Sequence, residues 1–85
     1  MSRTQIYLNG IAARAAWYRA GYLDRAEEQP CRSPNGTYID GWYAHGIGWS
    51  YNYPGIPSDL SRDTNFMADV EKRSDAIRKV LGEIQ

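Results

Sequence analysis

The stretch from residue 18 to residue 42, YRAGYLDRAEEQPCRSPNGTYIDGW, decides the fold. It reads as the end of one helix, a turn, and the start of a second helix. Tyr38 and Trp42 are one helical turn apart, so they lie on the same face of the second helix. The small residues at positions 20 and 21 allow that face to approach the first helix closely. We therefore predict a helix–turn–helix hairpin held by a structural lock of five residues: Tyr18, Gly21, Tyr38, Gly41 and Trp42.

The first helix is predicted from Asn9-Gly10 to Glu28. Its apolar face follows the spacing of three and four residues that is typical of a helix, in Leu8, Ile11, Ala15, Tyr18 and Tyr22. Asn9 is a suitable N-cap, and Gln29-Pro30 ends the helix because the residue before a proline avoids the α region. Residues 5–8 are either a short extended segment or one more helical turn.

The second helix is predicted from Tyr38 to about Trp49. A loop rich in turn residues, positions 30–36, precedes it. Thr37 is the predicted N-cap, and Gly46 or Gly48 marks the C-terminal end. The following segment, residues 50–61, contains two prolines, a glycine and two tyrosines, and we expect it to be irregular.

A third helix is predicted to begin near Asp63 or Thr64 and to end at about residue 82. Its apolar stripe consists of Phe66, Val70, Ile77, Leu81 and Ile84. This stripe either completes the core of the hairpin or mediates a homodimer. The sequence thus predicts one all-α domain of three helices over residues 1–85. Its parts are a hairpin at about 9–49, an irregular segment at 50–61 and a C-terminal helix at about 63–82.

Composition excludes several classes of protein. With one cysteine and one histidine, the 85-residue chain has neither an internal disulfide nor the four ligands of a structural zinc site, so we expect no metal and no cofactor. The N-terminus lacks the apolar run of a signal peptide. No stretch approaches the roughly 18–20 apolar residues of a membrane span. We expect a protein of the cytoplasm, in a bacterium or an infected host cell, with no membrane partner.

Charge bears on the kind of partner. Ten Lys and Arg residues balance ten Asp and Glu residues, whereas proteins that grip nucleic-acid phosphates usually carry a positive excess. A local basic face is still available, because Arg14 and Arg25 are eleven residues apart and share one side of the first helix. The candidate phosphate contacts are Arg14, Arg19, Arg25 and Arg32. The alternative is a solvated face in which these arginines pair with Asp24, Glu27 and Glu28.

Aromatic residues form a run of Tyr38, Trp42 and Tyr43 on the second helix, followed by Trp49, Tyr51 and Tyr53. Tyr and Trp are enriched at the energetic centres of protein interfaces and also stack on exposed RNA bases. The alternative is that these rings only fill a core that has few aliphatic residues. We expect Tyr38 and Trp42 inside, and the three later rings to be more exposed.

A catalytic pair of Cys31 and His45, with Asp40 to orient the imidazole, is conceivable by residue type. The chain has no phosphate-binding loop, nucleophile elbow or zinc-protease motif. We therefore expect a structural or surface role for these residues and no enzymatic activity.

The hairpin residues resemble the ribosome modulation factor family and its short plasmid- and phage-borne relatives. The similarity spans about residues 11–46. It consists of Tyr18, Ala20, Gly21 and Arg25 on the first helix, Pro30-Cys31 at the turn with the family's two residues exchanged, and Gly41-Trp42 on the second helix. Tyr38 stands where the family usually has tryptophan.

This resemblance implies a helical hairpin that binds the small ribosomal subunit and keeps ribosomes silent in translation. Under it, the ribosome or rRNA is the expected partner. The alternative is a phage or mobile-element protein that inhibits a host defence or nucleoprotein complex through protein–protein contacts, led by Trp49, Tyr51 and Tyr53. The neutral charge favours this alternative, and the motif favours the ribosome.

Overall fold

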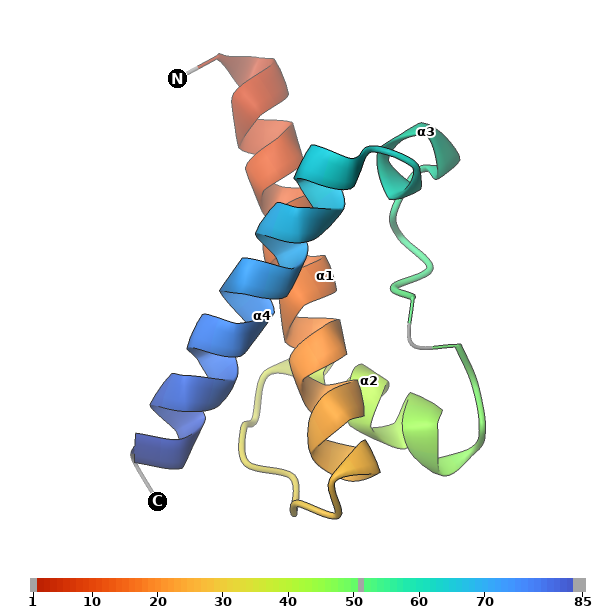
Figure 1. Ribbon diagram of the computed structural model, residues 1–85, viewed down its shortest axis with the longest axis vertical. Coiled ribbons are helices and arrows are strands. Elements are labelled where there is room, and N and C mark those ends of the chain that lie inside the picture. The colour runs from red at the N-terminus through yellow and green to blue at the C-terminus, as the bar shows by residue number, and fades with distance from the viewer. Residues whose placement is uncertain (1, 51, 84–85) are drawn as a thin grey trace.

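The computed structural model describes residues 2–50 and 52–83 (Figure 1). It contains the helices α1 (Arg3–Ala26), α2 (Gly36–Gly46), α3 (Ser58–Ser61) and α4 (Thr64–Glu83). The described residues form no strand, so the predicted all-α class is confirmed. The number of helices differs from the prediction, because the segment predicted to be irregular contains the single turn α3. Pro57 precedes this turn, and its carbonyl oxygen accepts bonds from the amides of Leu60 and Ser61.

The first helix is longer than predicted at its N-terminus. It begins at Arg3, because the Ser2 hydroxyl caps it by accepting a hydrogen bond from the Gln5 amide at 3.1 Å. The predicted cap at Asn9 is therefore wrong. Asn9 lies inside α1, where its side-chain oxygen accepts from Nη2 of Arg73 on α4 at 3.1 Å.

The end of α1 comes two residues before the predicted position. Glu27 is the C-cap, and Glu28 adopts a left-handed conformation with φ of 60°. The Gln29 amide then bonds back to the Asp24 carbonyl at 2.8 Å. This pattern is a helix-closing turn in which a residue of positive φ reverses the chain.

The second helix begins earlier and ends earlier than predicted. Asn35, and not Thr37, is the N-cap, because its side-chain oxygen accepts from the amides of Thr37 and Tyr38 at 3.0 and 3.1 Å. After Gly46 the chain turns through Gly48, which has φ of 75° and so uses the freedom of glycine. Trp49 consequently lies outside α2.

Helix α1 is the central element of the fold, and α2 and α4 each pack against it (Figure 1). Asp63 caps α4, which starts where the sequence predicts. Alanines line the surface of α1 that meets α4, so the two helices come close around a core of Ala12, Ala15, Ala16 and Val70. A second cluster joins Ala20, Tyr38 and Leu81. The predicted stripe of α4 is therefore buried within the chain at Val70 and Leu81, and Ile84 lies outside the described residues.

Candidate functional site

Two glycines set the distance between α1 and α2. A Cβ atom on Gly21 would lie 1.9 Å from the carbonyl oxygen of Tyr38, and one on Gly41 would lie 1.9 Å from the carbonyl oxygen of Tyr18. The two backbones thus touch reciprocally, and a side chain at either position would force them apart. The structure brings the five predicted lock residues together at this crossing. The indole Nε1 of Trp42 also donates to the Gln29 carbonyl at 3.0 Å, which ties α2 to the turn.

A buried carboxylate beside the crossing was not found by sequence reasoning. Asp24 is fully buried and accepts a hydrogen bond from the Tyr38 hydroxyl. Arg32 donates to both of its oxygens, at 3.0 and 2.8 Å, and Nε of Arg78 donates at 2.9 Å. We call Asp24, Arg32, Tyr38 and Arg78 the Asp24 cluster. It joins α1, the loop, α2 and α4 at one point, so it is a structural centre of the fold.

The charge of Asp24 is stabilised by its partners. Burial by itself raises the pKa of this carboxyl, but the hydrogen bonds from Arg32, Tyr38 and Arg78 outweigh burial and hold the pKa below its ordinary value of 3.8. Burial and the Asp24 charge together raise the pKa of the Tyr38 hydroxyl, which therefore stays a donor. One signal in the sequence could have indicated this buried carboxylate. Asp24 follows Ala20 by one helical turn, so it lies on the buried face of the helix, where a carboxylate requires partners.

The four candidate arginines lie in different surroundings. Arg32 is held in the Asp24 cluster. Arg25 stacks over the Trp42 ring, with its Cζ atom 4.2 Å from the ring centroid. Arg19 is half-buried in a hollow that also contains Tyr53, and Arg14 is exposed. Of these four, Arg14 is thus the one with its side chain largely in solvent.

The segment after α2 is held in place by two tyrosines of α1. The Tyr18 hydroxyl donates to the Ser50 carbonyl at 2.8 Å, and the Tyr22 hydroxyl donates to the Trp49 carbonyl at 3.0 Å. The Tyr18 ring also packs against the Tyr53 ring, with their centroids 5.6 Å apart. These contacts fix the backbone of the segment and leave the Trp49 side chain free to face solvent.

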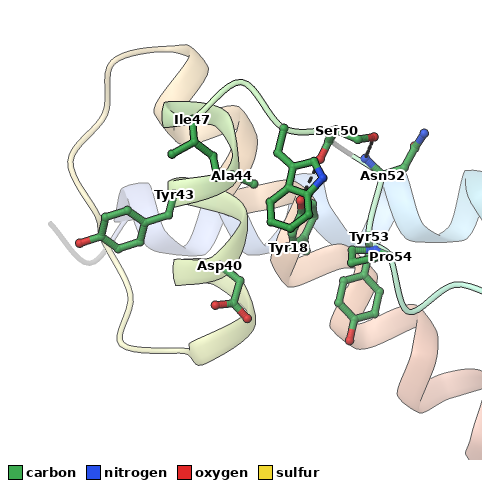
Figure 2. Close-up of a pocket in the computed structure, with 10 residues that line it drawn as sticks. Tyr18, Asp40, Tyr43, Ala44, Ile47, Ser50, Asn52, Tyr53 and Pro54 are labelled. Atoms are coloured by element: carbon green, nitrogen blue, oxygen red, sulfur yellow. Dashed lines mark hydrogen bonds between the residues drawn. The ribbon is translucent and has the colours of Figure 1, made fainter.

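A groove of about 380 Å³ opens between α2 and this segment (Figure 2). Its walls come from α2 and from residues 47–50 and 52–54, and Tyr18 reaches it from α1. The lining residues are Tyr18, Asp40, Tyr43, Ala44, Ile47, Trp49, Ser50, Asn52, Tyr53 and Pro54. The exposed fractions of three of them are high: 61% for Tyr43, 71% for Ile47 and 66% for Trp49. The groove therefore concentrates large apolar side chains at the surface.

Among the described residues that line the groove, Asp40 is the one with a charged side chain. Figure 2 shows it on the α2 wall with Tyr53 on the opposite wall, whereas Tyr43 projects from α2 away from Tyr53. Burial raises the pKa of the Tyr18 hydroxyl, and Tyr22 and the Asp40 carboxylate add to this effect. Tyr18 is thereby kept as a hydrogen-bond donor to the segment.

The predicted aromatic surface corresponds in part to this groove. Trp49 and Tyr53 both line it, with Trp49 exposed and Tyr53 half-buried. Tyr51 lies outside the described residues. Sequence reasoning missed Ile47 and Ala44 as lining residues, because it placed the end of α2 three residues too late.

The residues considered for catalysis make separate contacts. The Cys31 thiol donates to the Ser33 carbonyl at 3.4 Å, and the His45 ring packs edge-on against Tyr22 at 4.9 Å. Over residues 2–50 and 52–83, the structure has no group of three or more potential metal ligands. In the same residues, no helix has the length and apolar character needed to cross a membrane.

Comparison with known proteins gives no relative. No protein-family model, curated protein or solved structure matches this chain.

Proposed function

We propose that this protein is a non-catalytic binding protein that regulates or inhibits a larger complex by docking a protein partner in the groove. The observation that carries this proposal is the exposure of Ile47 and Trp49 beside a concave, apolar surface. Clustered exposed apolar side chains mark interaction sites, and tryptophan is prominent among residues that dominate binding energy. The hydrogen bonds of Tyr18 and Tyr22 hold the groove in shape before a partner arrives, which lowers the entropy cost of binding.

The chemistry of the groove supports a protein partner over RNA. Its lining combines apolar side chains with a carboxylate, and a carboxylate repels phosphate groups. The arginines that would have attracted RNA are largely engaged inside the protein, above all Arg32.

Affinity capture from cell lysate with two matched double variants tests this proposal. The variant Ile47→Ser/Trp49→Ser removes the apolar rim of the groove. The control Tyr7→Ser/Val80→Ser removes apolar side chains that are also more than half exposed but lie outside the groove. We expect partners identified by mass spectrometry to be retained by the wild type and the control and lost by the groove variant. Equal capture by all three proteins would contradict the proposal.

The ribosome is the second candidate partner. It is supported by the resemblance of the hairpin residues and by a basic position on the hairpin, where Arg25 stacks on Trp42. Arg14 is exposed on the same helix. Under this proposal, tagged protein sediments with ribosomal particles in a sucrose gradient, and Arg14→Gln/Arg25→Gln releases it while the groove variant stays bound. Wild-type protein found only at the top of the gradient would exclude the ribosome.

A further inference from the structure

The groove contains a carboxylate without an internal counter-ion. Asp24 pairs with Arg32 and Arg78, and Asp69 pairs with Arg73. Asp40, in contrast, is exposed and forms no salt bridge with any residue that the structure describes. Its negative charge is therefore available to a group that enters the groove.

The surroundings of Asp40 suit a cation. The rings of Tyr18, Trp49 and Tyr53 line the same groove. The face of an aromatic ring attracts an ammonium or guanidinium group and repels an anion. A carboxylate has the same preference, because it is negatively charged. A positive group between the ring of Tyr53 and the carboxylate of Asp40 would be attracted from both walls (Figure 2).

The rest of the lining suits apolar side chains. Ala44, Ile47 and Pro54 present aliphatic surface, and the volume of about 380 Å³ accommodates one long side chain with part of its neighbours. Sites for small ligands span about 300–1,000 Å³. The groove is thus of a size for a short stretch of polypeptide and not for a folded domain.

We infer that the groove binds a segment of the partner protein in which an arginine or lysine is flanked by apolar residues, with the basic group beside Asp40 and the aromatic rings. This inference rests on the proposed function, since it names the chemistry of the segment that docks. Asp40 carries a negative charge and no other described residue of the groove lining is charged, so the complementary charge on the partner is positive.

Selection of peptides tests the inference directly. A displayed library of random 12-residue peptides is panned on the wild-type protein. Enriched peptides are then synthesised and titrated into wild type, Asp40→Asn and Asp40→Lys. We expect enrichment of Arg or Lys next to apolar residues, with affinity reduced on the order of tenfold by Asp40→Lys and less by Asp40→Asn. The matched control is Asp75→Lys, which reverses an exposed charge on α4 and should leave affinity unchanged.

The location of binding is read from the indole NMR signal of Trp49, assigned with Trp49→Ser. Peptides that shift this signal but show neither a basic residue nor any dependence on Asp40 would overturn the inference and leave the proposed function standing. Failure of every peptide to shift it would contradict both. If a 12-nucleotide oligouridine binds the groove in preference to the peptides, the occupant is RNA and the inference is wrong. If the protein dimerises and Asp40→Lys abolishes the dimer, the occupant is a second copy of this chain and the inference is likewise wrong.

Discussion

The crossing of α1 and α2 and the groove beside it are built from the same kinds of residue, yet they differ in almost every physical respect. At the crossing, Tyr38 has no exposed surface and its hydroxyl is bonded to the buried Asp24. At the groove, Trp49 is mostly exposed although its backbone is fixed by Tyr22. The comparison shows that an aromatic residue in this chain stabilises the fold or is available to a partner according to what covers it.

The two regions also differ in how tightly they constrain the chain. The crossing depends on contact between backbones, which leaves no space for adjustment, and on a carboxylate whose partners come from three parts of the sequence. The groove depends on side-chain contacts from Tyr18 and Tyr22 to the segment, namely their hydroxyl hydrogen bonds and the packing of the Tyr18 ring on Tyr53. Substitutions at the crossing should therefore affect stability, and substitutions at the groove should affect binding.

The largest loss of stability is expected from Asp24→Asn. The variant leaves Arg32 and Arg78 without their shared counter-charge, and breaking a buried ion pair typically costs about 3–5 kcal/mol. Small domains have only about 5–15 kcal/mol in total. Urea denaturation followed by circular dichroism should show a much lower midpoint at pH 7. A midpoint equal to that of the wild type would mean that the cluster is not a structural centre.

The same carboxylate predicts a dependence on pH. Because the pKa of Asp24 is lower in the folded protein than its ordinary value of 3.8, its contribution is complete above about pH 4 and is lost as the pH falls through the folded pKa. The wild type should therefore lose more stability than Asp24→Asn between pH 5 and pH 3, two conditions chosen to bracket that ordinary value. Parallel losses in the two proteins would assign the acid sensitivity to other carboxylates.

The next largest effect is expected from Gly21→Ala. The new methyl group would lie 1.9 Å from the Tyr38 carbonyl oxygen, so α1 and α2 must separate, at a cost of about 2–3 kcal/mol. The control is Gly36→Ala, because no atom lies within 4 Å of the added methyl group. Thermal denaturation should show a clear decrease for the first variant and no decrease for the second. Equal melting temperatures would contradict the close crossing.

A smaller effect, confined to the groove, is expected from Tyr18→Phe. The substitution removes the hydrogen bond to the Ser50 carbonyl, worth about 1 kcal/mol, and keeps the ring. Hydrogen exchange of the backbone amides of Trp49, Ser50, Asn52 and Tyr53 should become faster, while amides of α4 keep their protection. Tyr43→Phe serves as the control, since it removes a hydroxyl from an exposed ring. Faster exchange in both variants would show that Tyr18 does not hold the segment.

The smallest change in stability is expected from Trp49→Ser. The side chain is mostly exposed, and surface substitutions of this kind usually change the free energy of unfolding by no more than about 0.5 kcal/mol. Binding of a groove partner should nevertheless be lost, as measured by titration with a selected peptide. A large loss of stability would show that the Trp49 side chain belongs to the core and not to the binding surface.

The sequence predicted the elements of the fold better than their ends. The hairpin and the approximate start of α4 follow from periodicity, which is a local signal, whereas the caps predicted at Asn9 and Thr37 are wrong. The N-cap of α1 was misplaced because Ser2 and Asn9 are both good caps, and local chemistry does not choose between them. The turn α3 was missed because a single turn has too few residues to show a period.

The candidate site was predictable only in part. The glycines and aromatics of the crossing share helical faces, so their meeting could be argued from spacing. Arg32 was placed among the RNA contacts, whereas its partner Asp24 comes eight residues earlier and their other partner, Arg78, comes from the last helix. Pairing of the candidate arginines with Asp24 was the alternative interpretation, but nothing in the spacing indicates that this pair is buried or that Arg78 joins it.

By itself, the sequence determined that this chain forms helices, where they roughly lie, and that Gly21 and Gly41 allow two of them to cross closely. These properties arise from hydrogen bonds and steric contacts between residues a few positions apart. Only the tertiary structure decided that Tyr38 is covered and Trp49 is not, and that Asp24 is neutralised by two arginines. It also decided that Asp40 faces an open groove without a counter-ion among the residues that the structure describes. Burial and charge pairing depend on which distant segments come together, and that information is not contained in any single stretch of the chain.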